Sequence, residues 1–299
     1  MAVSCTNHVV FRSPAVCICD FRCHPTDNGC SAEESSKHDD FVFVRRGLFV
    51  KHLGTRRVVA DPNHVVFFNR EEGYRVSHPV AGGDDCTTFH IRSDLLRPLL
   101  AERRQIVHDD ERGGFRVMQV PCDSALHLRH WQLLRSIRQG VLSDVAVEEA
   151  ALNLTEELFD HGIEPTGRPT RHRRYDTHRA HRDAADCVRQ CLAADFENPL
   201  HIDDLARRVH LSPYHMCRLF REQTGRTIHA YRTQLRLRAA LHRLAEDGDD
   251  LTGLALDLGF SDQSHFTHAF RRTFGVTPAA FRRSASTRLL HQTSKNLQA

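Results

Sequence analysis

The side chains best suited to chemistry in this 299-residue sequence gather near its C-terminal end. Residues 263–272 offer amide, hydroxyl, imidazole and guanidinium groups, with no acidic residue among them: Gln263, Ser264, His265, His268, Arg271 and Arg272. Amide and guanidinium groups form paired hydrogen bonds with base edges in the major groove of DNA, and guanidinium groups also bind phosphates. A short helix that carries these groups on one face would suit that groove.

Two short helices and a tight turn are predicted to hold this surface. The first helix has an apolar stripe at Leu254, Ala255 and Leu258. Gly259 follows and permits the positive φ of a turn, and Ser261 or Asp262 caps the second helix. Gly275 and Pro278 end that helix. Its apolar back consists of Phe266, Ala269, Phe270 and Phe274.

This stretch resembles the signature of AraC/XylS-type transcriptional regulators. The likeness rests on residues 259–266 (GFSDQSHF), Phe270-Arg271-Arg272, Phe274-Gly275 and Thr277-Pro278. The resemblance implies a bacterial, dimeric, effector-responsive regulator that binds double-stranded DNA, and that contacts RNA polymerase if it is an activator. It also implies an all-α C-terminal domain in which a long helix joins two helix-turn-helix motifs.

An earlier segment, residues 202–220, repeats the same plan, with Ser212 as N-cap and Pro213 as the first residue of a recognition helix. His210 stands where the second copy has Gly259, which predicts a strained turn. The helix predicted between the copies, residues 227–246, would be about 30 Å long. That length is close to the ~34 Å between successive major-groove segments on one side of DNA.

The resemblance assigns individual contacts on the two recognition helices. It implies base contacts from the first helix by Tyr214, Cys217 and Arg218. From the second helix it implies base contacts by Gln263, Ser264, His265 and His268. Phosphate contacts fall to Arg221, Arg271 and Arg272. Arg218 suits guanine and Gln263 suits adenine, because both side chains can form two hydrogen bonds at once.

The N-terminal half has a different pattern, so the sequence predicts an α+β chain. Short apolar runs recur every 8–12 residues between residues 17 and 90, separated by Gly, Pro and Asn, as is typical of a sandwich or barrel. Arg45-Arg46-Gly47, Asp61-Pro62, His78-Pro79 and Gly82-Gly83-Asp84 resemble the cupin-like sensor domains of the same regulators. Residues 1–15 show no clear pattern.

Two helical patterns follow, over residues 124–139 and 143–159. They form an antiparallel pair that either covers the barrel or, through residues 124–160, also forms the seam of a homodimer. The predicted domains are a cupin-like sensor and dimerisation domain (1–161), a basic linker (162–182), a double helix-turn-helix DNA-binding domain (183–284) and a disordered tail (285–299).

Composition narrows the function classes. The net charge of +3 is too small to indicate DNA binding by itself. No signal-peptide pattern and no apolar run of about 18 residues are present, so we expect a cytoplasmic protein without a membrane partner. No nucleotide-binding glycine loop, nucleophile elbow or tight histidine cluster is present, which predicts that the protein is not an enzyme.

Five of the ten cysteines fall within the first thirty residues. A disulfide framework is not expected in a cytoplasmic chain. Cys19 and Cys23 have the spacing of half a zinc site, and no matching half lies nearby in the sequence. Further candidate ligands are Cys30, Cys86, His24, His38 and His78. Two interpretations stay open: a metal- or redox-sensing regulator switched by this cluster, or incidental cysteines around a pocket for a small organic effector. Operator sequence, effector, and activation or repression are also open.

Overall fold

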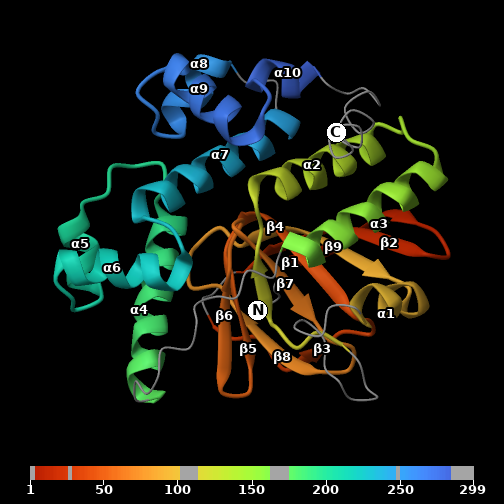
Figure 1. The fold of residues 1–299 in the computed structure, drawn as a ribbon, viewed down its shortest axis with the longest axis horizontal. Helices are drawn as coiled ribbons and strands as arrows, with labels where there is room; N and C mark the ends of the chain where they lie inside the picture. Colours follow the sequence, from red (N-terminus) through yellow and green to blue (C-terminus); the bar gives the residue numbers. More distant parts are fainter. Residues whose placement is uncertain (1–3, 26–28, 102–113, 162–174, 247–249, 284–299) are drawn as a thin grey trace.

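The computed structural model describes residues 4–25, 29–101, 114–161, 175–246 and 250–283. Within these ranges a unit of sheets and helices is followed by an all-helical unit, so the chain mixes α and β structure as predicted (Figure 1). None of the helices in these ranges is both long and apolar enough to cross a membrane. The predicted tail, and the linker as far as residue 174, lie outside the described residues.

The larger sheet has six antiparallel strands in the order β1-β2-β9-β4-β7-β10. Its two faces follow from strict alternation: Phe41 and Phe43 lie in the core beneath the helices, while Val42 and Val44 face the second sheet. The strands are β1 (Ser4–Arg12), β2 (Val16–His24), β9 (Asp84–Ile91), β4 (Asp40–Gly47), β7 (His64–Phe68) and β10 (Gln119–Pro121). Strand β1 arises from the segment in which the sequence showed no pattern.

The smaller sheet has four strands in the order β3-β8-β5-β6. They are β3 (Glu34–Ser35), β8 (Gly73–Ser77), β5 (Phe49–Leu53) and β6 (Arg56–Ala60). The expected closed barrel is not formed by the described strands, because the edge strands β1 and β10 of the larger sheet pair with no strand of the smaller one. The structure is therefore two open sheets packed face to face, and the cupin-like detail stays a prediction.

Three helices of this unit lie over the other face of the larger sheet: α1 (Ser93–Ala101), α2 (Ser124–Arg138) and α3 (Asp144–His161). Helix α2 is buried on two sides. Its Leu126 and Leu133 pack into the core above the sheet. Its Leu128, Trp131 and Leu134 instead join the core of the C-terminal helices. The sequence predicted the first contact but not the second.

The C-terminal helices are α4 (Tyr175–Ala194), α5 (Ile202–Arg208), α6 (Pro213–Thr224), α7 (Ile228–Glu246), α8 (Leu251–Asp257), α9 (Gln263–Phe274) and α10 (Pro278–Arg283). Helix α7 has nearly the predicted bounds. Helix α4 begins at Tyr175, inside the predicted linker and earlier than the expected start at residue 184. The buried apolar stripe of α4 begins only at Ala185, so the polar first turns gave no periodic pattern that could predict a helix. They are helical because a helix, once formed, extends readily by single residues.

A buried carboxylate connects the two units. Asp61, in the turn between β6 and β7, is fully buried. Its Oδ2 accepts hydrogen bonds from Arg189 Nη2 of α4 at 3.2 Å and from the Tyr231 hydroxyl of α7. Burial disfavours the charged form, but the Arg189 charge and these hydrogen bonds outweigh burial and hold the pKa of Asp61 well below its usual range. Arg189 Nη2 also donates to Val59 O at 2.6 Å.

Further arginines tie the helical unit to backbone carbonyls of the sheet unit and its helices. Buried Arg238 of α7 donates to Pro62 O and, at 2.6 Å, to Cys122 O. Arg135 of α2 donates to Phe281 O of α10 at 2.7 Å. The two units are therefore joined by a polar network at the Asp61 turn and by an apolar contact at α2.

We predict that Asp61→Asn lowers the free energy of unfolding by about 3 kcal/mol or more, because it removes a counter-charge from a buried guanidinium. Fluorescence of Trp131, the only tryptophan in the sequence, can follow denaturant unfolding. Asp183→Asn is the control: it breaks the Arg57–Asp183 pair, whose side chains are 47% and 41% exposed. Such exposed pairs contribute less than about 1 kcal/mol. Equally small losses in both variants would contradict the role of Asp61.

We also predict that mild acid destabilises the fold through His127 and His130. Burial lowers the pKa of both imidazoles well below the ordinary value of 6.5. Below about pH 6.5 only the unfolded chain takes up these protons, so stability falls as pH falls, by up to about 1.4 kcal/mol per pH unit for each group. His130→Phe, which keeps a ring beside Phe43, should reduce the slope between pH 7 and pH 5. A flat profile in the native protein would refute this prediction.

Candidate nucleic-acid interface

Helix α9 presents the polar surface expected from the sequence. Asp262, rather than Ser261, is the N-cap, and its Oδ1 accepts from His265 N at 2.7 Å. Gly275 ends the helix in the left-handed region at φ 74°. The apolar residues Phe266, Ala269, Phe270 and Phe274 are buried. The predicted contact residues remain exposed: Gln263, Ser264, His265, His268, Arg271 and Arg272.

Helix α6 repeats this arrangement in the first motif. Ser212 Oγ accepts from His215 N at 3.3 Å, and Pro213 is the first helical residue, as predicted. Met216, Leu219 and Phe220 are buried. Of the predicted contact residues, Tyr214 is 78% exposed, and Arg218 and Arg221 are exposed.

Two residues of α6 that were predicted to contact DNA, Cys217 and Arg218, interact with neighbouring residues of the protein. Cys217 is only half-exposed and packs partly against the core of the first motif, so it offers a small apolar edge. Arg218 Nε donates to Glu222 Oε1 at 2.9 Å, one helical turn away on an exposed surface. Arg218 must exchange that partner to reach a base. Exposed pairs of this kind contribute about 0.3–0.5 kcal/mol, so the exchange costs little.

The turns of the two motifs have the same backbone shape with different residues. His210 has φ 54° and Gly259 has φ 76°, so the strained turn expected at His210 is present. Equivalent hydrogen bonds close both turns, from Leu211 N to Ala206 O at 3.1 Å and from Phe260 N to Ala255 O at 2.9 Å.

Helix α7 carries the two motifs on separate cores. Its first half packs with α4, α5 and α6 through Ile228, Tyr231 and Leu235. Its second half packs with α8 and α9 through Leu237, Leu241 and Leu244. The 19 residues of α7 give a length of about 28 Å. Helices α6 and α9 are thus packed against opposite ends of the single helix α7.

The four cysteines predicted as metal ligands are not brought together. Cys19 Sγ lies 3.9 Å from Cys17 Sγ on β2, and Cys30 is exposed. Cys86 is buried and donates to Asp84 Oδ2 at 3.0 Å.

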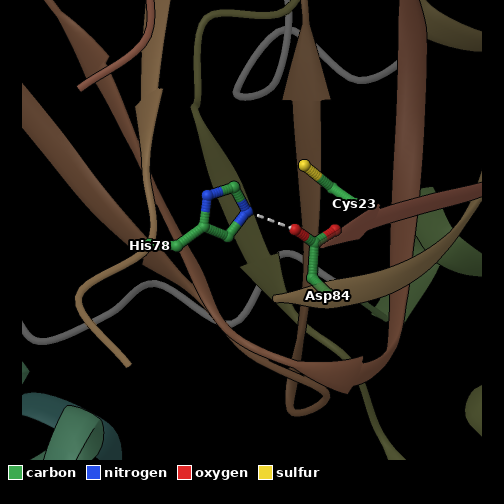
Figure 2. Close-up of side chains that lie close together, drawn as sticks. All are labelled: Cys23, His78 and Asp84. Carbon is green, nitrogen blue, oxygen red and sulfur yellow. Dashed lines mark hydrogen bonds and ion pairs between the residues drawn. The ribbon is translucent and has the colours of Figure 1, made fainter. Parts of the chain in front are cut away.

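Cys23 lies in a different group. Cys23, His78 and Asp84 are all buried, and their potential ligand atoms lie within 4.8 Å of one another (Figure 2). Asp84 was not among the predicted ligands, because an aspartate after two glycines looks like an ordinary turn residue.

Helix α4 carries a second cysteine pair. Cys187 and Cys191 lie one helical turn apart, and both are partly exposed. Arg208 Nη1 lies 3.5 Å from Cys191 Sγ. The hydrogen bond from Cys187, followed by the contact with Arg208, lowers the pKa of Cys191. Sequence spacing could not reveal Arg208, which belongs to α5.

Known proteins match the helical unit. Residues 205–284 match a family model described as a helix-turn-helix domain. The regulatory protein PocR of Salmonella typhimurium (strain LT2) is 34% identical over 91 residues, which are 30% of this chain and 30% of that protein. The right origin-binding protein of Escherichia coli (strain K12) is 33% identical over 105 residues, 34% of this chain and 36% of that protein. The chain thus spans about a third of the length of these curated relatives.

One solved structure covers the same region. The crystal structure of a transcriptional regulator from Chromobacterium violaceum, described as containing an AraC-type DNA-binding domain, has 28% sequence identity and a TM-score of 0.34. The match covers 36% of this chain and 95% of that chain.

The two turns predict opposite responses to substitution. A Cβ at Gly259 would lie 2.1 Å from Glu197 O, so Gly259→Ala should cost about 2 kcal/mol or more. His210→Gly should be neutral or stabilising by up to about 1 kcal/mol, because it relieves a left-handed non-glycine residue. Helical circular dichroism during denaturant unfolding measures both changes. A stable Gly259→Ala variant would show that the turn does not need glycine.

Proposed function

We propose that the helical unit is a DNA-binding domain of the AraC/XylS type and that the protein is a sequence-specific, effector-responsive transcription regulator. The observation that carries the proposal is the repetition of one recognition unit at the two ends of α7. Both α6 and α9 are capped, backed by a buried apolar stripe, and exposed along the face with the predicted contact residues.

The exposed side chains support a division of roles between bases and phosphates. Arg218 and Gln263 suit two-point contacts with guanine and adenine. Tyr214 and the half-exposed edge of Cys217 suit stacking or contact with a thymine methyl group. Arg221, Arg271 and Arg272 suit phosphates, which orient the protein without reading sequence. Ser264, His265 and His268 complete the proposed base-reading surface of α9.

A cleft between the two units supports the effector part of the proposal. Its volume is about 490 Å³, and its lining includes Arg46 and Gly83 of the sheet unit together with His242 and Arg243 of α7. A small molecule bound there would contact both units. It would therefore act directly on the helix that carries both recognition helices.

Only part of the segment proposed for the homodimer, residues 124–160, is left uncovered by the helical unit. Leu128, Trp131 and Leu134 of α2 are already covered by the helical unit. The outer face of α3 remains available, where Val145 is 73% exposed and Glu149 and Glu156 are also exposed. We therefore propose α3 as the seam.

The proposed base contact by Arg218 predicts a loss of discrimination on substitution. After a preferred duplex is selected from a randomised pool with the full chain, Arg218→Ala should weaken binding to it by about 5- to 150-fold. Binding to scrambled DNA should change little. Arg272→Ala should instead weaken both duplexes and reduce the salt dependence by about one phosphate contact.

Arg92→Ala is the charge-matched control, because Arg92 lies just before α1, is half-exposed and pairs with Asp94. It should leave both affinities unchanged. Equal weakening of preferred and scrambled DNA by Arg218→Ala would make Arg218 a phosphate contact. Failure of the full chain to enrich any duplex would contradict sequence-specific binding itself.

A further inference from the structure

Three buried side chains that take no part in the proposed DNA surface converge between the two sheets. Cys23 is the last residue but one of β2, His78 follows β8, and Asp84 begins β9; they are 3%, 6% and 3% exposed. Figure 2 shows the His78 ring directed toward the Asp84 carboxylate, with the Cys23 sulfur nearby. A thiol, an imidazole and a carboxylate are the three ligand types that zinc takes in proteins.

We propose that Cys23, His78 and Asp84 form a zinc site, with Cys5 as the fourth ligand. His78 Nε2 lies 2.6 Å from Asp84 Oδ1, and the three ligand atoms lie within 4.8 Å of one another. Tetrahedral zinc bonds of 2.0–2.3 Å set ligand atoms about 3.3–3.7 Å apart. The ion thus replaces the His78–Asp84 hydrogen bond, and these three buried ligand atoms need to move by only about 1 Å. Cys5 lies outside this group of three and must turn toward the ion to bind it.

Cys5 supplies the second sulfur. It lies opposite Cys23 in the register of β1 and β2, with the two Sγ atoms 2.6 Å apart. Cys5 is exposed, so we expect it to close the buried group on the solvent side once an ion is bound. Two thiolates and an imidazole favour zinc over magnesium or calcium, which prefer oxygen ligands.

The backbone explains why Asp84 can lie so close to Cys23. Gly83 has φ 66°, and a Cβ there would lie 1.8 Å from Cys23 O. Only glycine permits this approach of the loop to the end of β2. Cys86 then fixes the carboxylate, since its Sγ donates to Asp84 Oδ2 at 3.0 Å and leaves Oδ1 for His78 or the ion.

The same loop touches the helical unit, which gives the site a regulatory role that rests on the proposed function. Asp85, next to the ligand Asp84, has Oδ2 3.3 Å from His242 Nε2 on α7. Gly83 also lines the cleft against α7. Zinc holds Asp84, and with it the 83–85 loop, in one position against the helix that joins the recognition helices. Bound zinc should therefore change DNA affinity.

Metal binding is tested on the full chain, purified under reducing conditions and stripped with a chelator. Zinc titrated against a chromophoric competitor should bind at one ion per chain. Cobalt in its place should give a thiolate charge-transfer band and the intense visible bands of tetrahedral coordination. Absence of stoichiometric zinc binding, or cobalt bands without thiolate character, would overturn the site.

Variants assign the ligands. Cys5→Ser, at an exposed position that the fold tolerates, should reduce the thiolate band by about half. Cys23→Ser and Asp84→Asn should each weaken zinc binding by about 100-fold or more. Loss of a residue that only hydrogen-bonds to a metal ligand already weakens binding about 10- to 100-fold. Cys19→Ser, on the same strand, is the matched control and should bind as the native protein does. Native affinity in Cys23→Ser, with native Trp131 fluorescence, would overturn the assignment.

Measurements of DNA binding distinguish the proposed regulation by zinc from the proposed function as a sequence-specific DNA-binding protein. Affinity for the selected duplex is measured with and without bound zinc, in the native chain and in Cys5→Ser. A zinc-dependent change that Cys5→Ser reduces supports the regulatory role, and equal affinities overturn it. If no duplex is enriched at all, the proposed function fails, while the zinc titration still decides the site.

Discussion

The contact of Asp61 with Arg189 and Tyr231 is the constraint on which the rest of the structure depends. The carboxylate comes from a turn of the sheet unit, the guanidinium from α4 and the hydroxyl from α7. Three elements from distant parts of the sequence therefore meet at one buried atom, Asp61 Oδ2. Buried ion pairs add modest net stability, but their geometry admits few alternatives. This contact thus sets the orientation of α7, and with it that of both recognition helices.

The remaining contacts between the units build outward from that point. Arg238, two turns further along α7, donates hydrogen bonds to the carbonyl oxygens of Pro62 and Cys122. The Asp61 turn is therefore bound by both Arg189 and Arg238. On either side of Arg238, Leu237 and Leu241 pack with Trp131 and Leu134 of α2 in one apolar core. The proposed zinc loop reaches α7 near the same place through Asp85 and His242. Helix α7 is therefore the element that every proposed signal must reach.

Sequence reasoning succeeded where local chemistry decides structure. The apolar stripe of α7, the caps at Ser212 and Asp262 and the turn at Gly259 all depend on neighbours within a few residues. It failed where partners are distant. The Asp61 turn was foreseen, but Arg189 and Tyr231 were not, since no spacing relates them. The sandwich or barrel was predicted from short apolar runs between turn residues, a pattern that specifies strands but not whether edge strands meet. Cys5 became a ligand candidate only once β1 paired with β2, and Asp84 only once β9 paired with β2.

The two helix-turn-helix motifs are attached to the sheet unit by different kinds of contact. Within the described residues, the second motif shares its buried core with Leu128, Trp131 and Leu134 of α2, whereas the buried core of the first motif is formed by helical-unit residues. The first motif meets a small apolar cluster of the sheet unit through Ala193 of α4. Exposing apolar surface raises heat capacity, and exposing polar surface lowers it. Detachment of the second motif therefore carries the larger heat-capacity change. Because apolar contacts weaken on cooling, we expect the attachment of the second motif to the sheet unit to depend on temperature more strongly than that of the first motif.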